Sequence, residues 1–245
     1  MPVRRVGGWL LAVINRGCGA EEESRVVTVL RRVYERVGGG GYAELHLYPS
    51  RWEMEAALLE EARERGVRVD AVFPVMHEAW TGLPRIHVAP SELEGLGEAG
   101  EAFLVHEAFH SVLHGSLEYY MVSLPPASSD EEWVAAYIAA TSLKDLEVHM
   151  EMKKHGFRRE LLAEKRYWET TLGERWLCET IEDVGDVLRA ATIWLVLGMS
   201  PPLATTCRER VAPLINLFRN LIRQHTRPWS QLDKAIRITQ KMLAL

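Results

Sequence analysis

The chain has few of the side chains that mark disordered, extracellular or nucleic-acid-binding proteins. Its 245 residues include six asparagines and glutamines in total, six lysines and three cysteines. The net charge of −5 leaves no basic excess that would draw the protein to nucleic acid or to an anionic membrane. No stretch reaches the roughly 18 consecutive apolar residues that a membrane-spanning helix needs. With 47% hydrophobic and 26% charged residues, the composition predicts a soluble globular protein.

The cysteines Cys18, Cys178 and Cys207 are odd in number and far apart in the sequence. Their spacing matches neither a zinc ribbon nor a CxxC motif, and it predicts no disulfide framework. We therefore expect a reducing compartment and a cytoplasmic protein.

Arginine outnumbers lysine by 23 to six, glutamate is abundant and amide side chains are scarce. This bias is typical of proteins from thermophiles. We take the bias to indicate a thermophilic source, although the base composition of a genome can produce the same excess of arginine. The bias indicates no function.

Hydrophobic periodicity predicts an α+β fold with two lobes. A small α/β lobe over residues 1–120 ends in a helix over Glu98–His114, and an all-helical lobe over residues 121–245 follows. Strands are expected over residues 42–48, 67–73 and 85–89, and the other helices of the first lobe over 21–37 and 50–65. Residues 7–14 could be a first strand or the start of a helix, and a strand is favoured. Helices of the second lobe are expected over 131–155, 158–171, 174–197, 202–224 and 230–243, with Pro213 kinking or splitting the fourth.

The Glu98–His114 helix contains the motif HExxH, formed by His106, Glu107 and His110. Positions four apart lie on one face of a helix, so both histidines can reach a single Zn²⁺. Glu107 is one step round the helix, where it can act as general base toward a metal-activated water. The neighbouring side chains are apolar or uncharged, which is typical of a buried metal-bearing helix.

Catalytic zinc usually takes three protein ligands, and a straight helix cannot supply the third. His114 follows His110 by four residues, but positions i, i+4 and i+8 spread over about 12 Å along a helix. His114 is therefore interpreted as a residue that supports a ligand, faces substrate or ends the helix.

The third ligand is expected from the helix over residues 131–155. A helical wheel places Asp145 and His149 on the buried arc and Glu147 and Glu151 on the exposed arc. A carboxylate among apolar side chains is costly unless it is paired or binds a metal. Asp145 is the favoured ligand, with His149 next and Glu147 third. A satisfied core pair of Asp145 and His149 is the alternative.

Two weaker features complete the expected site. The segment Pro84–Pro90 has the prolines of an edge strand that could bind substrate backbone, although a plain core strand explains it equally well. Tyr119, Tyr120, His114 and His155 are candidate donors for a developing oxyanion, and their spacing favours none of them.

The HExxH helix, followed by a loop and an acid on the next long helix, resembles the gluzincin-type zinc metallopeptidases. The short α/β lobe before the motif is similar to that of the compact archaeal minigluzincins, and the resemblance covers about residues 42–155. It implies His106 and His110 as zinc ligands and Glu107 as base. The family has Glu followed by Asp four residues later, whereas the preferred pair here is Asp145 and His149.

The sequence therefore predicts a zinc-dependent metallopeptidase that hydrolyses peptide bonds of a peptide or protein substrate, at an active site between the two lobes. No nucleic-acid or membrane partner is expected, and the sequence does not give the oligomeric state. Two alternatives stay open. One is a catalytically inactive, metallopeptidase-like interaction or regulatory module. The other is a non-enzymatic helical protein with a chance HExxH.

Overall fold

The computed structural model describes residues 2–67, 73–121 and 129–243. The fold is mixed α+β, and the chain divides into two compact units, Met1–Met121 and Val122–Leu245. Each unit has its own hydrophobic core and is described separately below. The expected strand over residues 67–73 lies almost entirely outside the described residues.

The first unit is built on one five-stranded sheet with the order β1-β2-β3-β5-β4. The central strands β2, β3 and β5 are parallel, and β1 and β4 are antiparallel to their neighbours. The expected strands over 7–14, 42–48 and 85–89 are present, whereas β1 and β4 were not predicted. The strands are β1 (Val3–Val6), β2 (Trp9–Asn15), β3 (Gly41–Leu47), β4 (Val75–Glu78) and β5 (Arg85–Val88).

The strand Arg85–Val88 is not an edge strand, contrary to one of the two sequence interpretations. β5 lies between β3 and β4, and the described sheet ends at β4. The prolines that flank β5 lie outside its ladder, so they do not interrupt its pairing on either side. On this side of the described sheet, β4 is the end strand that could accept a further strand.

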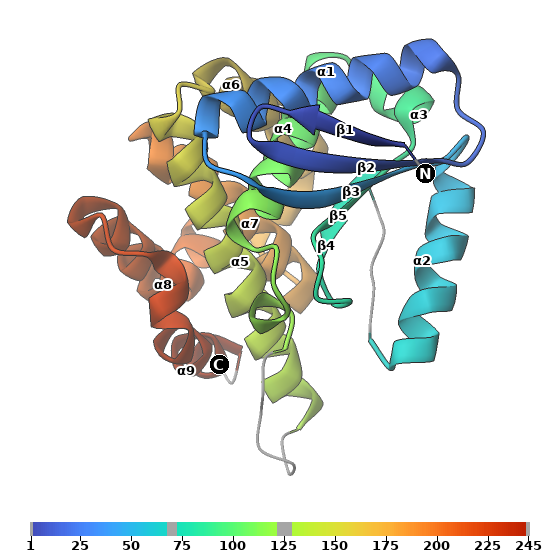
Figure 1. Cartoon of the computed structure of the whole chain (residues 1–245). Helices are drawn as coiled ribbons and strands as arrows, with labels where there is room; N and C mark the ends of the chain where they lie inside the picture. Colours follow the sequence, from blue (N-terminus) through green and yellow to red (C-terminus); the bar gives the residue numbers. More distant parts are fainter. Residues whose placement is uncertain (1, 68–72, 122–128, 244–245) are drawn as a thin grey trace. The chain divides into compact units, whose positions relative to one another are not determined.

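Helices cover both faces of this sheet (Figure 1). On one face, Tyr34 of α1 (Ala20–Val37) stacks on Trp9 of β2 and hydrogen-bonds Ser111 of α4 (Glu98–Leu113). On the other face, α2 (Arg51–Arg65) packs against Tyr48. The short helices α3 (Pro90–Gly95) and η1 (Leu117–Tyr119) flank α4 in the chain.

Local sequence signals explain where α2 begins and ends. The Ser50 hydroxyl accepts a hydrogen bond from the backbone N–H of Glu53, as expected of an N-cap. Gly66 ends the helix in the left-handed conformation, with φ of 67°, which glycine adopts without steric cost. Both ends agree with the sequence prediction.

Within its described residues, the second unit has only helices as regular secondary structure. α5 packs against both α7 and α9. Its elements are α5 (Asp130–Lys154), α6 (Arg158–Thr171), η2 (Gly173–Leu177), α7 (Ile181–Leu197), α8 (Thr205–Gln224), η3 (Pro228–Gln231) and α9 (Leu232–Leu243).

Two helix predictions in this unit need correction. The helix expected over 174–197 is broken, because Cys178 adopts a left-handed conformation and Thr180 caps the start of α7. The predicted split at Pro213 does not occur, since α8 runs through it.

Two of the three cysteines are joined by a disulfide, contrary to the sequence prediction. Cys178 and Cys207 form a disulfide, with their Cα atoms 5.1 Å apart. The prediction of no disulfide was wrong because 29 residues separate the pair, and only the packing of α8 beside η2 brings them together. Cys18 is a free cysteine.

No helix within the described ranges is both long enough and apolar enough to cross a membrane.

Candidate metal centre and catalytic side chains

The HExxH motif lies in the second half of α4, a helix that is buried over most of its length. Ala102, Leu104, Val105 and Phe109 are all buried around it. The apolar flanks predicted this environment, and His106 and His110 are among the polar groups that it encloses.

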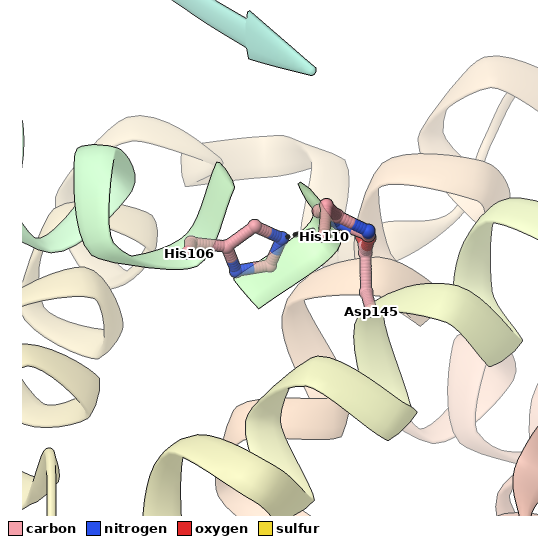
Figure 2. Close-up of side chains that lie close together, drawn as sticks. All are labelled: His106, His110 and Asp145. Carbon is pink, nitrogen blue, oxygen red and sulfur yellow. Dashed lines mark hydrogen bonds between the residues drawn. The ribbon is translucent and has the colours of Figure 1, made fainter. Parts of the chain in front are cut away.

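His106 and His110 turn their Nε2 atoms toward one another across one helical turn (Figure 2). These two atoms are 2.9 Å apart. Two imidazole nitrogens that converge from positions i and i+4 are the arrangement that a tetrahedral zinc ion uses. The donor type, the spacing and the burial in this unit all fit zinc.

His114 supports the second of these histidines. Its Nδ1 atom lies 2.8 Å from Nδ1 of His110, on the side of the ring away from His106. A metal-binding histidine usually donates its other ring N–H to such a partner, which fixes its tautomer and orientation. This contact corresponds to the supporting role that the sequence left open for His114.

A glycine allows the chain to turn directly after His114. A Cβ atom at Gly115 would lie 2.6 Å from the carbonyl oxygen of Ser111 and 3.0 Å from Cβ of Pro84. Any other residue would push the end of α4 away from Pro84, and His114 would move with it.

Glu107 points toward the end strand β4. Its Oε2 atom accepts a hydrogen bond of 2.9 Å from the backbone N–H of His77. The HExxH glutamate is thereby tied to the strand beside it in space, although 30 residues separate the two in sequence.

The side chain of His77 is also fixed by its neighbours. Its Nδ1 atom lies 2.7 Å from the hydroxyl of Tyr120, and its ring is nearly parallel to that of His110, with 6.0 Å between the ring centroids. Of the oxyanion donors named from the sequence, Tyr120 therefore lies beside β4, the strand that Glu107 contacts. Tyr119 packs its ring against His114, and His155 pairs with Glu151 in the second unit.

In the second unit, Asp145 is buried on α5, with 5% of its surface exposed (Figure 2). Its Oδ2 atom accepts a hydrogen bond of 2.8 Å from Nε of Arg189 on α7. The charge of Asp145 holds the pKa of Arg189 above its usual range. Burial with a cationic partner agrees with the arc that the helical wheel assigned to Asp145.

His149 is buried on the same helix, but its contacts go to other residues. Its Nδ1 atom lies 2.7 Å from the Thr192 hydroxyl, and its Nε2 atom lies 3.2 Å from Oε1 of Glu164. Both partners are themselves buried. His149 is thus part of a polar core cluster with α6 and α7, and this cluster satisfies both of its ring nitrogens.

Glu147 does not face water, so its predicted position was wrong. Only 6% of its surface is exposed, and its Oε1 atom accepts a hydrogen bond of 2.8 Å from Nε of Arg227. The wheel failed here because α5 packs on more than one side, against α7 and also against α9 and η3.

A second buried polar cluster lies on the sheet face that α2 covers. Glu78 forms an ion pair with Arg85, and His87 contacts both Glu78 and the Tyr48 hydroxyl. Burial raises the pKa of Glu78 to about 7, because the loss of hydration outweighs the attraction of Arg85. Burial likewise holds the pKa of His87 well below its usual range.

Sequence reasoning missed His77 and Glu164. His77 lies in a four-residue strand that is too short to show alternation. Glu164 could have been found, since Phe157, Leu161 and Glu164 recur at helical spacing and place a carboxylate on the apolar stripe of α6.

Comparison of the chain with known protein families, with curated proteins and with solved structures finds no match.

Proposed function

We propose that this chain is a zinc-dependent metallopeptidase of the gluzincin type. The observation that carries the proposal is the arrangement on α4, where the two histidines converge while Glu107 contacts β4. Two metal-binding histidines, a general base and a strand able to pair with peptide backbone therefore meet within one unit. The resemblance in the HExxH motif supports the same assignment.

His106 and His110 would hold the ion, with His114 fixing the orientation of the His110 ring. We propose Asp145 of the second unit as the third ligand. The second carboxylate oxygen of Asp145 would serve this role while Oδ2 stays bonded to Arg189. Bound zinc would supply Lewis acidity, polarising the scissile carbonyl and lowering the pKa of water toward 7.

The protein's own groups perform the remaining steps. β4 aligns an extended substrate by backbone pairing, because its outer edge joins no other strand of the described sheet. Glu107 takes a proton from the attacking water and passes it to the leaving amine. Burial of the histidines keeps bulk water away from the reacting centre.

We also propose a cytoplasmic location in a thermophilic organism. The Cys178–Cys207 disulfide is unusual in a reducing compartment. Intracellular proteins of hyperthermophiles are the known exception, so the arginine-rich composition and the disulfide fit together in this hypothesis.

Cleavage of unstructured peptides, combined with zinc analysis, tests the function. The parent protein should hold about one zinc per chain and cleave, whereas Glu107→Gln should keep the zinc and lose cleavage. Zinc without cleavage in the parent would favour the inactive interaction module. A parent protein without stoichiometric zinc would favour the helical protein with a chance motif.

A further inference from the structure

The backbone of β4 alternates in the direction of its hydrogen bonds, and this alternation decides what His77 can bind. The bond from the Ala89 N–H to the Pro74 carbonyl makes these two residues a hydrogen-bonded pair. In an antiparallel ladder, hydrogen-bonded pairs alternate with non-hydrogen-bonded pairs. His77 is opposite Ile86, three residues further along β4, so this pair is a non-hydrogen-bonded one. The N–H and C=O of His77 therefore point away from β5.

The outward N–H of His77 is the group that a substrate strand would use. Strand addition to a sheet joins outward backbone groups of the end strand to those of the incoming peptide. In this structure that N–H donates instead to Glu107. The general base and the substrate carbonyl thus require the same donor.

Contacts of the His77 side chain hold the hydrogen bond between the His77 N–H and Glu107 in position. The Tyr120 hydroxyl bonds Nδ1, and the ring lies against His110 with an interplanar angle of 4°. The His77 side chain itself is buried. Since His77 cannot swing away, the N–H must stay directed at the space where Glu107 and a substrate would meet.

We propose that β4 latches Glu107 through the His77 N–H, and that an extended peptide releases the base by taking over this donor. The proposal rests on the proposed peptidase function and adds its regulation. On binding, a substrate carbonyl accepts the His77 hydrogen bond, and Glu107 Oε2 then accepts a hydrogen bond from the attacking water. The His77 N–H exchanges one acceptor for another, and Glu107 exchanges one donor for another, so no donor is left unsatisfied.

This exchange selects a class of substrate. A peptide must be extended and long enough to pair with β4, because a short ester or a folded helix offers no carbonyl in that register. Cleavage of short substrates should therefore be slow even when they reach the reacting centre.

Two variants at one position separate the backbone from the side chain. His77→Ala and His77→Pro both remove the imidazole, but only His77→Pro removes the N–H. Proline is tolerated on an end strand where the N–H does not join the ladder. Thermal melts and zinc content confirm that each variant is folded and loaded.

The measurement is the ratio of kcat/KM for a short ester to that for an unstructured decapeptide. Relative to His77→Ala, His77→Pro should raise this ratio by roughly tenfold or more, the effect of one hydrogen bond to a charged group. Equal ratios in the two folded variants would overturn the proposal.

Amide hydrogen exchange at residue 77 gives a readout that needs no catalysis. Exchange should be slow in the parent and faster in Glu107→Ala, while the matched surface variant Glu101→Ala on the same helix should resemble the parent. Adding the decapeptide to Glu107→Ala should slow the exchange again.

The exchange outcomes also separate the two proposals. Unchanged exchange in Glu107→Ala, or no slowing by the peptide, overturns the latch. A parent that shows the latch and binds the peptide but never cleaves it contradicts the peptidase function and leaves the latch standing.

Discussion

His110 and His114 face each other through their Nδ1 atoms at 2.8 Å, one turn apart at the end of α4. This contact leaves Nε2 of His110 directed at His106. The His110 ring is thus oriented by a neighbour four residues away, in the manner of histidines that bind metals.

Loss of this contact should weaken zinc binding without removing a ligand. We expect His114→Ala to lower zinc affinity by roughly 10- to 100-fold, measured by competition with a chelator. His155→Ala is the matched control, because His155 pairs with Glu151 on a different helix. Equal affinities in the two variants would show that His114 does not orient His110.

The acids on α5 should affect zinc and stability differently. Asp145→Ala should lower zinc affinity more than His149→Ala, because both ring nitrogens of His149 are engaged by Thr192 and Glu164. Glu147→Ala should leave zinc binding unchanged. Zinc titration of the three alanine variants checks this order. A largest loss in Glu147→Ala would assign the third ligand to Glu147, as in the family pattern.

The buried position of Glu147 adds an expectation for its stability. Because the carboxylate pairs with Arg227, Glu147→Ala should destabilise the fold by about 1 to 2 kcal/mol. Urea unfolding of the metal-free protein measures this change. Glu151→Ala on the same helix is the control, and its effect should stay within about 0.5 kcal/mol.

The disulfide should contribute measurably to thermal stability. Closing a loop of 29 residues between Cys178 and Cys207 corresponds to roughly 3 to 4 kcal/mol of loop entropy. Reduction, or the variant Cys207→Ser, should therefore lower Tm by roughly 10 °C. Cys18→Ser should leave Tm unchanged. An unshifted Tm after complete reduction, verified by thiol titration, would contradict this expectation.

Glu78 should make stability fall as the pH rises. Its pKa is raised to about 7 in the folded protein, from the 4.5 of an exposed glutamate, so the folded state binds the proton more tightly. The contribution is fully present below pH 4.5 and is lost as the pH rises through 7, by about 3 kcal/mol in total. The unfolding free energy at pH 8 minus that at pH 5 should therefore be more negative in the parent than in Glu78→Gln. The comparison between the two proteins cancels the opposite contribution of His87, which Glu78→Gln retains. An identical pH dependence would place the Glu78 pKa in the usual range of carboxyl groups.

Local signals predicted the parts of the fold that depend on neighbours in sequence. Ser50 and Gly66 set the ends of α2, and the spacing of His106 and His110 placed both on one face of α4. The wheel also placed Asp145 and His149 correctly in the buried part of α5. Whether Asp145 binds a metal stays a prediction.

Partners that are distant in sequence could not be predicted in this way. Arg227, 80 residues from Glu147, turns an expected surface acid into a buried ion pair. His77 joins Glu107 across 30 residues, from a strand of only four. Neither residue carries a local pattern, because in both cases tertiary packing determines the contact.

The two end strands of the described sheet differ in how they resist unwanted pairing with other chains. β1 carries Arg4 and Arg5, whose charges discourage another chain from adding to it. β4 has no such charges at its centre, and Glu107 occupies the outward N–H of His77 instead. We therefore expect the same carboxylate to hinder strand addition by another chain at β4. Preparations of Glu107→Ala should form β-rich assemblies on storage more readily than Glu107→Gln, whose side-chain oxygen still covers that donor.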